Sequence, residues 1–416
     1  MTSVESPDQP PPDFPPPPRS VSAWKGRLRE SGTPAVIAIA GSRGKTTVVR
    51  LVNAMFREAG SRTALWTDVG VEINDRRQHG ELVPWSRALV RLRAGTLDVA
   101  IQELDWSTVH AVGLPSAIYP VVAVTNLCAN NDFCMVRLEM KRATKALARV
   151  LAAVRPDGRL ILNGEDFAVA SAAPRNSATT LVGLNRETPL VRSHLQHGGS
   201  AAWLDDDQLL VGVSARPDVV AHVSHFRLCQ SGAIGFQVHN ALLAASIARA
   251  CGVPLAAISR ALRRFDASLR LMPGSFNIVS FRGATIIVDR PAPSWFMRIA
   301  LRAVAHLGGR RLLTIVGRMD SVPEDDLVET GRLLGRGAGA LILHSNDADA
   351  KRVELFRTGM LVNEVPPVVV STGSEQQAVN RALSMLRPDD TVLILADQPA
   401  AVVRALERAK TSVSAA

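Results

Sequence analysis

The sequence has 416 residues, of which 47% are hydrophobic, so it is long enough for two or three domains with buried cores and excludes a wholly disordered or fibrous protein. Its 48 Lys and Arg residues outnumber its 38 Asp and Glu residues, which gives a net charge of +10. Only six of the basic residues are lysine, and the arginines are scattered along the chain. We therefore interpret the charge as compositional bias and expect no nucleic-acid partner, although an ATPase coupled to nucleic acid stays open on the charge alone.

Residues 1–22 are rich in proline and carry acidic residues where a secretory signal would be basic and then apolar. We expect a disordered, polyproline-like arm, which either binds a partner that recognises proline-rich segments or is a passive tail. The four cysteines form no CxxC pair, which argues against a zinc ribbon or a thioredoxin-like motif and favours a reduced, cytoplasmic setting. No run reaches the roughly 18 apolar residues of a membrane span.

The first ordered elements predict the opening of an α/β nucleotide-binding domain. A short helix is expected at residues 24–30, followed by a continuous apolar run at 35–40 that is typical of a strand covered on both faces. A glycine-rich turn comes next, and residues 46–60 then repeat apolar side chains at helical spacing. Strand, glycine turn and helix in this order characterise that class of domain.

The rest of the chain predicts two α/β domains, residues 23–269 and 270–416. In the first, buried parallel strands are expected at 63–66, 97–102, 121–124 and 160–162, and helices at 240–251 and 255–265. Residues 174–235 alternate in short pieces and predict a small antiparallel, β-rich insertion. The pattern breaks at 267–277, and a second strand-helix series follows, with strands at 284–288, 311–316, 340–344, 368–370 and 391–395.

The glycine-rich turn predicts a phosphate-binding loop at residues 41–47. Glycines let backbone N–H groups approach phosphate oxygens, the start of a helix favours negative charge, lysine bridges the terminal phosphates, and a hydroxyl binds Mg²⁺. The strand before and the helix after it favour nucleotide binding over an accidental turn. The strict P-loop glycine is replaced by Ile39. The predicted nucleotide-binding residues of this loop are Gly41, Ser42, Arg43, Gly44, Lys45, Thr46 and Thr47.

The loop and several spaced motifs resemble the Mur ligase family of ATP-dependent amide ligases, nearest to the ligase half of cyanophycin synthetases and to capsular poly-γ-glutamate synthases. That family uses the shorter spacing from Gly41 to the Gly-Lys-Thr triplet. The resemblance extends over four further segments, which are 99–105, 122–126, 156–166 and 235–245, and over 273–277 and 286–289 near the predicted domain boundary. It implies a P-loop Mur-type ATPase domain followed by a Rossmann-like C-terminal ligase domain, with ATP and Mg²⁺ as cofactors.

The resemblance also implies a chemistry, in which ATP converts a carboxylate into an acyl phosphate that an amino acid then attacks to form an amide. Lys45 would bridge the β- and γ-phosphates, and Thr46 and Glu103 would hold Mg²⁺. The alternative for Glu103 is a solvated carboxylate at a strand end. Lys145 lies where relatives place a carbamylated lysine that binds a second Mg²⁺, but it is equally consistent with a solvated helix face.

Three further residues match the family's nucleotide contacts. Asn240 corresponds to the adenine-contacting position, and its alternative is a helix cap. Asp289 aligns with the acidic residue that opens the family's Asp-Tyr-Ala-His-Asn-Pro run. Arg318, with Asp320, loosely resembles the family's Gly-x-x-Asp-Arg turn.

Several motif positions depart from the family. Asn130 and Asn131 replace an Asp-His metal pair, with Asp132 as a substitute after a one-residue slip, and Ser275 replaces an arginine. The phosphate loop also begins at residue 41, too early for the domain that recognises a UDP-linked sugar, so we expect no UDP-muramoyl substrate. The expected function is an ATP- and Mg²⁺-dependent acid–amino-acid ligase. The alternative is a nucleotide-binding scaffold or regulator that has lost ligation.

Overall fold

The computed structural model describes residues 16–127, 137–174, 177–213, 216–344 and 350–414. Within them the chain divides into two compact units, an N-terminal unit that ends at Phe265 and a C-terminal unit that comprises the residues from Asp266 onward together with 137–139. The sequence placed this boundary near residue 270. None of the helices in these ranges has the length and apolar character needed to cross a membrane.

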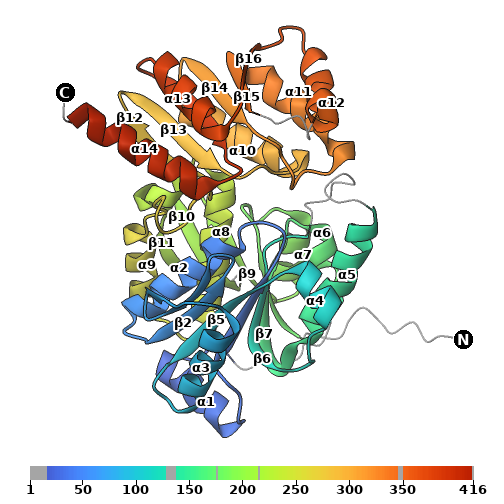
Figure 1. Cartoon of the computed structure of the whole chain (residues 1–416). Helices are drawn as coiled ribbons and strands as arrows, with labels where there is room; N and C mark the ends of the chain where they lie inside the picture. Colours follow the sequence, from blue (N-terminus) through green and yellow to red (C-terminus); the bar gives the residue numbers. More distant parts are fainter. Residues whose placement is uncertain (1–15, 128–136, 175–176, 214–215, 345–349, 415–416) are drawn as a thin grey trace, which may run out of the picture. The chain divides into compact units, whose positions relative to one another are not determined.

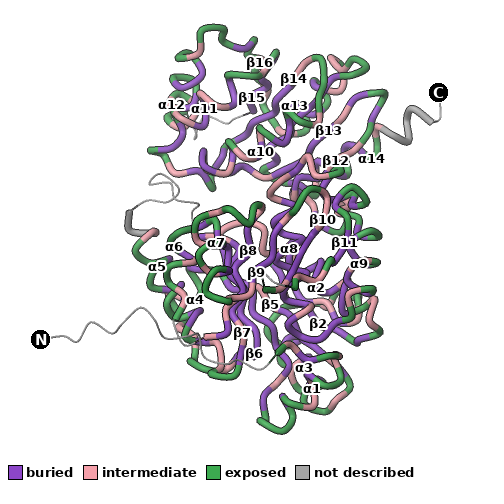
Figure 2. Tube along the Cα trace, turned by 180° about the vertical axis from the view of Figure 1, so that it is seen from behind, coloured by how far each residue is buried: buried purple, intermediate pink, exposed green. Residues whose placement is uncertain are grey.

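The N-terminal unit is built on one sheet of 11 strands in the order β11-β10-β9-β8-β7-β6-β1-β5-β2-β3-β4 (Figure 1). The strands are β1 (Val36–Ala40), β2 (Thr63–Thr67), β3 (Gly70–Ile73), β4 (Arg76–Arg77), β5 (Val99–Leu104), β6 (Tyr119–Val124), β7 (Val154–Asn163), β8 (Ala178–Val182), β9 (Ser200–Asp205), β10 (Gln208–Val213) and β11 (Arg216–His222). Every residue of β1 and β6 is buried, as expected of central strands covered on both faces. In Figure 2, β6 lies in the buried, purple centre of the unit.

Helices cover this sheet. They are α1 (Val21–Glu30), α2 (Lys45–Glu58), α3 (Leu82–Arg93), α4 (Trp106–Val112), α5 (Arg137–Ala152), α6 (Phe167–Ala170), α7 (Pro189–Gln196), α8 (Gly235–Ala250) and α9 (Leu255–Arg264). Helix α2 packs against α8 and α9 (Figure 1). Its apolar residues at helical spacing, such as Leu51, Met55 and Phe56, are fully buried. The ring of Trp24 in α1 lies 6.2 Å from that of Phe56, so α1 covers the same helix.

Strand β1 pairs in parallel with β5 on one side and with β6 on the other. The register aligns Ala40 at the end of β1 with Leu104 of β5 and with Val124 of β6. The residues that follow these three strands therefore meet at one edge of the sheet. In open α/β sheets this carboxyl edge is where ligands bind.

Two expectations for the N-terminal unit were wrong. Residues 174–235 are no separate insertion, because β8 pairs in parallel with β7 and β9 in parallel with β8, and only β9, β10 and β11 pair antiparallel. Strands β9, β10 and β11 continue the main sheet beyond β8. Helix α8 begins at Gly235, five residues before the expected position, so Asn240 is inside the helix and is no cap.

The C-terminal unit contains a six-stranded sheet in the order β12-β13-β17-β14-β15-β16. Its strands are β12 (Asn277–Phe281), β13 (Ala284–Asp289), β14 (Arg311–Val316), β15 (Ala340–His344), β16 (Val368–Thr372) and β17 (Asp390–Leu395). The sequence missed β12, which pairs antiparallel with β13 through a turn at Arg282 and Gly283. Both turn residues have positive φ. Such turns are usually recognised in a sequence by Asn, Asp or Gly at the first position, and arginine occupies it here.

The helices of the C-terminal unit are α10 (Ser294–Leu307), α11 (Leu327–Gly337), α12 (Ala350–Leu361), α13 (Glu375–Met385) and α14 (Pro399–Ser414). The connections from β13 to β16 move across the sheet in one direction, and the connection through α13 returns to β17. Because such crossovers are right-handed, α13 lies on the opposite face from α10, α11 and α12. The reversal produces a crevice at the carboxyl ends of β14 and β17.

Candidate active site

The glycine loop after β1 is folded tightly against its neighbours. Gly41 has φ +146°, and a Cβ there would lie 1.9 Å from the Thr125 hydroxyl oxygen. Gly44 has φ +84°, and a Cβ there would lie 2.6 Å from Oδ1 of Asn240. Both positions therefore accept only glycine, because backbone conformation and space each exclude a side chain.

The loop is held by the two residues after β6. The backbone N–H of Arg43 donates to Oδ1 of Asn126 at 3.0 Å, and the Thr125 hydroxyl donates to the Arg43 carbonyl oxygen at 2.6 Å. The Ser42 N–H donates to the Asn126 carbonyl oxygen at 3.0 Å. Thr125 and Asn126, the last two residues of the motif segment 122–126, thus support the loop. Trp106 adds a bond from its indole N–H to the Ser42 hydroxyl oxygen at 3.1 Å.

Lys45 and Thr46 open helix α2 and reach carboxylates from two neighbouring strands. The Lys45 Nζ lies 3.2 Å from Oδ1 of Asp105, which follows β5. The Thr46 hydroxyl donates to Oδ1 of Asp68, which follows β2, at 3.3 Å. Neither Asp68 nor Asp105 was among the residues predicted for the site. A signal was available, since Asp68 lies two residues and Asp105 three residues beyond the ends of the predicted parallel strands at 63–66 and 97–102.

Glu103 lies in β5 beside this cluster. Its Oε1 is buried and has no hydrogen-bond partner within the described part of the chain. Burial raises the pKa of the Glu103 carboxyl to about 7, an effect that the Lys45 ammonium opposes and the Asp68 carboxylate increases. A buried carboxylate oxygen that accepts no hydrogen bond is available to bind a cation or a donor from a ligand.

The residues around Glu103 fit Mg²⁺. That ion prefers hard oxygen ligands, and it takes one or two carboxylates from the protein while waters and substrate phosphates fill the other positions. The Thr46 hydroxyl and the Glu103 carboxylate supply such oxygens, with Asp68 adjacent. No group of three His, Cys, Asp or Glu residues with metal-binding geometry occurs in the described ranges. The donor set therefore matches a metal bound together with a nucleotide rather than by protein alone.

Three further predicted residues belong to the N-terminal unit. Asn240 contacts the loop at Gly44, and its Nδ2 donates to Oε1 of Gln237 at 3.0 Å. Its predicted adenine contact remains a prediction. Thr47 is buried in α2, at 4% exposure, and its contact with the nucleotide also remains one. Lys145 is exposed on α5, and the residues that would share its metal, Asn130 to Asp132, lie outside the described ranges.

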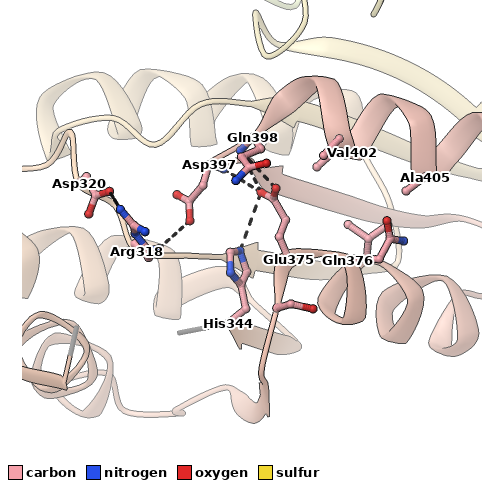
Figure 3. Close-up of a pocket in the computed structure, with 12 residues that line it drawn as sticks. Arg318, Asp320, His344, Glu375, Gln376, Asp397, Gln398, Val402 and Ala405 are labelled. Carbon is pink, nitrogen blue, oxygen red and sulfur yellow. Dashed lines mark hydrogen bonds and ion pairs between the residues drawn. The ribbon is translucent and has the colours of Figure 1, made fainter. Parts of the chain in front are cut away.

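The C-terminal unit contains a second group of polar residues, around a cavity of about 390 Å³ (Figure 3). Arg318 follows β14 and lines this cavity, where its guanidinium pairs with Asp320. The sequence missed the other polar residues of the lining, which are His344, Ser374, Glu375, Gln376, Asp397 and Gln398. Asp289 ends β13 outside the lining, with Oδ1 accepting the Arg290 N–H at 2.9 Å.

Comparisons with known proteins agree with this architecture. Residues 39–248 match the model of the Mur ligase middle domain. The cyanophycin synthetase of Nostoc sp. is 26% identical over 389 residues, which are 92% of this chain and 43% of that protein. A UDP-N-acetylmuramoyl-L-alanyl-D-glutamate–2,6-diaminopimelate ligase of Geobacillus thermodenitrificans is 25% identical over 304 residues, covering 68% of this chain and 56% of that one. The chain thus spans less than half the length of the cyanophycin synthetases.

Solved structures share the fold. A pseudomurein peptide ligase type C from Methanothermus fervidus matches with a TM-score of 0.61 at 16% identity, over 90% of this chain and 79% of that one. Escherichia coli FolC in complex with ADP matches with a TM-score of 0.62 at 17% identity, over 94% and 93% of the two chains. The family resemblance and the α/β fold class expected from the sequence are confirmed.

Proposed function

The chain belongs to the Mur ligase family, and we propose on this basis that it is an ATP-dependent ligase that joins a carboxylate to an amino acid. The observation that carries the proposal is the pairing of a glycine loop that accepts no side chain with the unpartnered Glu103 oxygen beside it. The first is suited to the phosphates of a nucleotide, and the second to the metal ion that accompanies them.

The N-terminal unit would bind ATP and activate the carboxylate. The loop N–H groups and the N-terminus of α2 face the phosphates, Lys45 screens their charge, and Thr46 and Glu103 hold Mg²⁺. Bound Mg²⁺–ATP supplies the phosphoryl group that converts the carboxylate into an acyl phosphate, a good electrophile. In the structure the Lys45 ammonium is paired with the Asp105 carboxylate. When ATP binds, Lys45 would exchange this carboxylate for phosphate oxygens. We retain Lys145 as a proposed ligand of a second metal ion.

The C-terminal unit would supply the amino acid. Its cavity lies at the carboxyl ends of parallel strands and carries more carboxylates than cations, as suits a ligand with an ammonium group. The names of the relatives suggest which amines to test, since one of them is a 2,6-diaminopimelate ligase. Asp289 and Arg318 stay proposed nucleotide contacts of this unit.

The test is a steady-state assay of phosphate release from Mg²⁺–ATP. The carboxylates offered are the standard amino acids and short aspartate and glutamate peptides, and the amines are the standard amino acids and diaminopimelate. We expect phosphate release to require one carboxylate and one amine together, with an amide product detected by mass spectrometry. Binding of ATP without any substrate-dependent release would instead favour the scaffold alternative.

Lys45→Ala is the matched negative variant. We expect it to reduce turnover about a thousandfold, because a cation on the transferring phosphoryl group acts mainly in the transition state. Lys351→Ala, which removes an ammonium that is 75% exposed in the C-terminal unit and pairs with Glu324, should leave turnover unchanged. Equal rates for Lys45→Ala and wild type would contradict the proposed role of the loop.

A further inference from the structure

One histidine of the C-terminal cavity has an unused nitrogen. His344 is the last residue of β15, is 6% exposed, and lines the cavity with its imidazole (Figure 3). Its Nε2 has no hydrogen-bond partner among the residues that the structure describes. Oε1 of Glu375 lies 3.9 Å away, beyond hydrogen-bond distance. A buried polar nitrogen without a partner is costly, and this one is adjacent to a space that a ligand can enter.

Gly317 brings a carboxylate next to the same imidazole. A Cβ at this position would lie 2.2 Å from Oδ2 of Asp397 and 2.6 Å from Nε2 of His344. The carboxylate and the ring therefore flank one Cα atom, and only glycine leaves room for both. The side chains come from the ends of two strands, β15 and β17, on either side of β14.

The carboxylates around His344 are held by backbone N–H groups. Glu375 accepts the N–H of Asp397 at 2.8 Å, and Asp397 accepts the N–H of Arg318 at 3.0 Å. The guanidinium of Arg318 pairs with Asp320, so one of the three carboxylates is neutralised. The remaining lining offers acceptors and negative charge. A ligand with several N–H donors and a positive charge, such as a primary ammonium, satisfies both.

We propose that His344 is the base that accepts a proton from the ammonium of the amine substrate. This inference rests on the proposed ligase function. An ammonium has no lone pair and cannot attack, so one N–H proton must first move to Nε2, which leaves a neutral amine and an imidazolium. The amine lone pair then forms the C–N bond while the bond from the acyl carbon to the phosphate oxygen breaks. The second proton leaves the nitrogen with the phosphate.

The surroundings suit a base that is neutral before the reaction. Burial lowers the pKa of His344, and the Asp397 carboxylate opposes this shift. The charged groups that face the ring are Asp397, Glu375 and, behind Asp397, the Arg318–Asp320 pair. After proton transfer, Asp397 and Glu375 stabilise the imidazolium, as carboxylates do for catalytic histidines.

The first test observes His344 directly in the wild-type full chain and requires no variant to be active. The imidazole nitrogen resonances are followed by NMR as ethylammonium chloride is added, with tetramethylammonium chloride as a control that has no N–H donor. We expect ethylammonium alone to shift the Nε2 resonance and to lower the pKa of His344, because a bound cation disfavours the imidazolium. Identical responses to the two salts would overturn the proposal.

The second test uses His344→Gln in the phosphate-release assay. At pH 7 we expect a loss of about a hundredfold or more with an amino acid as the amine, partly recovered at higher pH, where more amine is already deprotonated. With hydroxylamine, which is largely unprotonated at neutral pH, the variant and wild type should turn over at similar rates. His306→Gln, an exposed histidine of α10 outside the cavity, is the matched control.

The outcomes separate this inference from the function on which it rests. If wild type releases phosphate with an amine and His344→Gln follows the same pH profile at the same rate, the role of His344 is wrong while the ligase stands. An equal loss with hydroxylamine and with the amino acid would also refute it, because it would mean a structural role. If wild type responds to no amine, both proposals fail.

Discussion

The two units present polar sites at the carboxyl edges of parallel sheets, but they build them differently. In the N-terminal unit the site is mostly backbone, and its shape is set by Gly41 and Gly44, where Thr125 and Asn240 fill the space that a side chain would need. In the C-terminal unit the site is an open cavity lined by side chains from the ends of several strands. A site built from backbone suits a constant ligand such as a triphosphate. A cavity lined by side chains suits a substrate whose identity differs from one enzyme to another.

This contrast predicts that the N-terminal site tolerates substitution poorly. Gly41→Ala should give the largest effect, because the added Cβ would lie 1.9 Å from the Thr125 hydroxyl oxygen and the backbone has positive φ. We expect the variant to lose about 3 kcal/mol of unfolding free energy and to lose ATP binding. Urea unfolding and calorimetry with Mg²⁺–ATP measure the two. Gly26→Ala, in α1 with open space around the new Cβ, should be neutral or stabilising. If Gly41→Ala folds with wild-type stability and binds ATP, the prediction that the N-terminal site tolerates substitution poorly is wrong.

Glu103 sharpens the contrast through pH. The folded protein holds this proton up to about pH 7, whereas the unfolded chain releases it near the ordinary value of 4.5, so the ligand-free protein should lose stability as the pH rises from 5 to 8. Glu103→Gln should remove this slope and be about 3 kcal/mol more stable than wild type at pH 8 without metal or nucleotide. Urea unfolding in EDTA measures it, and Glu187→Gln, whose side chain is 58% exposed, is the control. Parallel pH profiles for wild type and Glu103→Gln would contradict the buried carboxylate.

Asp397 tests the C-terminal side of the comparison. Asp397→Asn should raise the KM for the amine about tenfold, because the amine loses one exposed carboxylate of the cavity, and leave the Kd for ATP unchanged. Steady-state kinetics and calorimetry separate the two constants. Asp325→Asn, an exposed aspartate outside the cavity, should change neither. An effect on ATP alone would assign the cavity to the nucleotide.

Trp106 gives the smallest expected effect. Trp106→Phe removes the indole donor to Ser42 and should weaken ATP binding about fivefold, which corresponds to about 1 kcal/mol for one hydrogen bond. Fluorescence of Trp106 should also change on ATP binding in wild type and not in this variant. Trp295→Phe, a buried tryptophan of the C-terminal unit, should keep the wild-type ATP affinity. Unchanged affinity in Trp106→Phe would show that Thr125 and Asn126 suffice to hold the loop.

The sequence predicted the N-terminal site better than the C-terminal one. The loop residues, including Lys45 and Thr46, could be predicted because they are consecutive in the sequence. Glu103 could be predicted because it lies at the end of a recognisable strand. Asp68 was missed although the same strand-end reasoning applied to it. His344 and Asp397 were missed for a different reason, since 53 residues separate them and only the strand order β14 between β15 and β17 makes them neighbours.

Among the secondary-structure predictions, periodicity located the central strands and failed at the edges. Strands β14 and β15 were placed with their observed bounds. The β12–β13 hairpin was missed because its turn uses arginine at positive φ, and residues 174–235 were taken for an insertion because antiparallel alternation does not reveal which sheet a strand joins.

The N-terminal sheet ends in antiparallel hairpins on both sides, β2 to β4 at one margin and β9 to β11 at the other. These margins can therefore be lengthened at their turns without moving β1. The tip at Asp206, a surface turn with φ +50°, offers a place to graft a reporter domain or an affinity tag internally. A fusion there would leave both chain termini native.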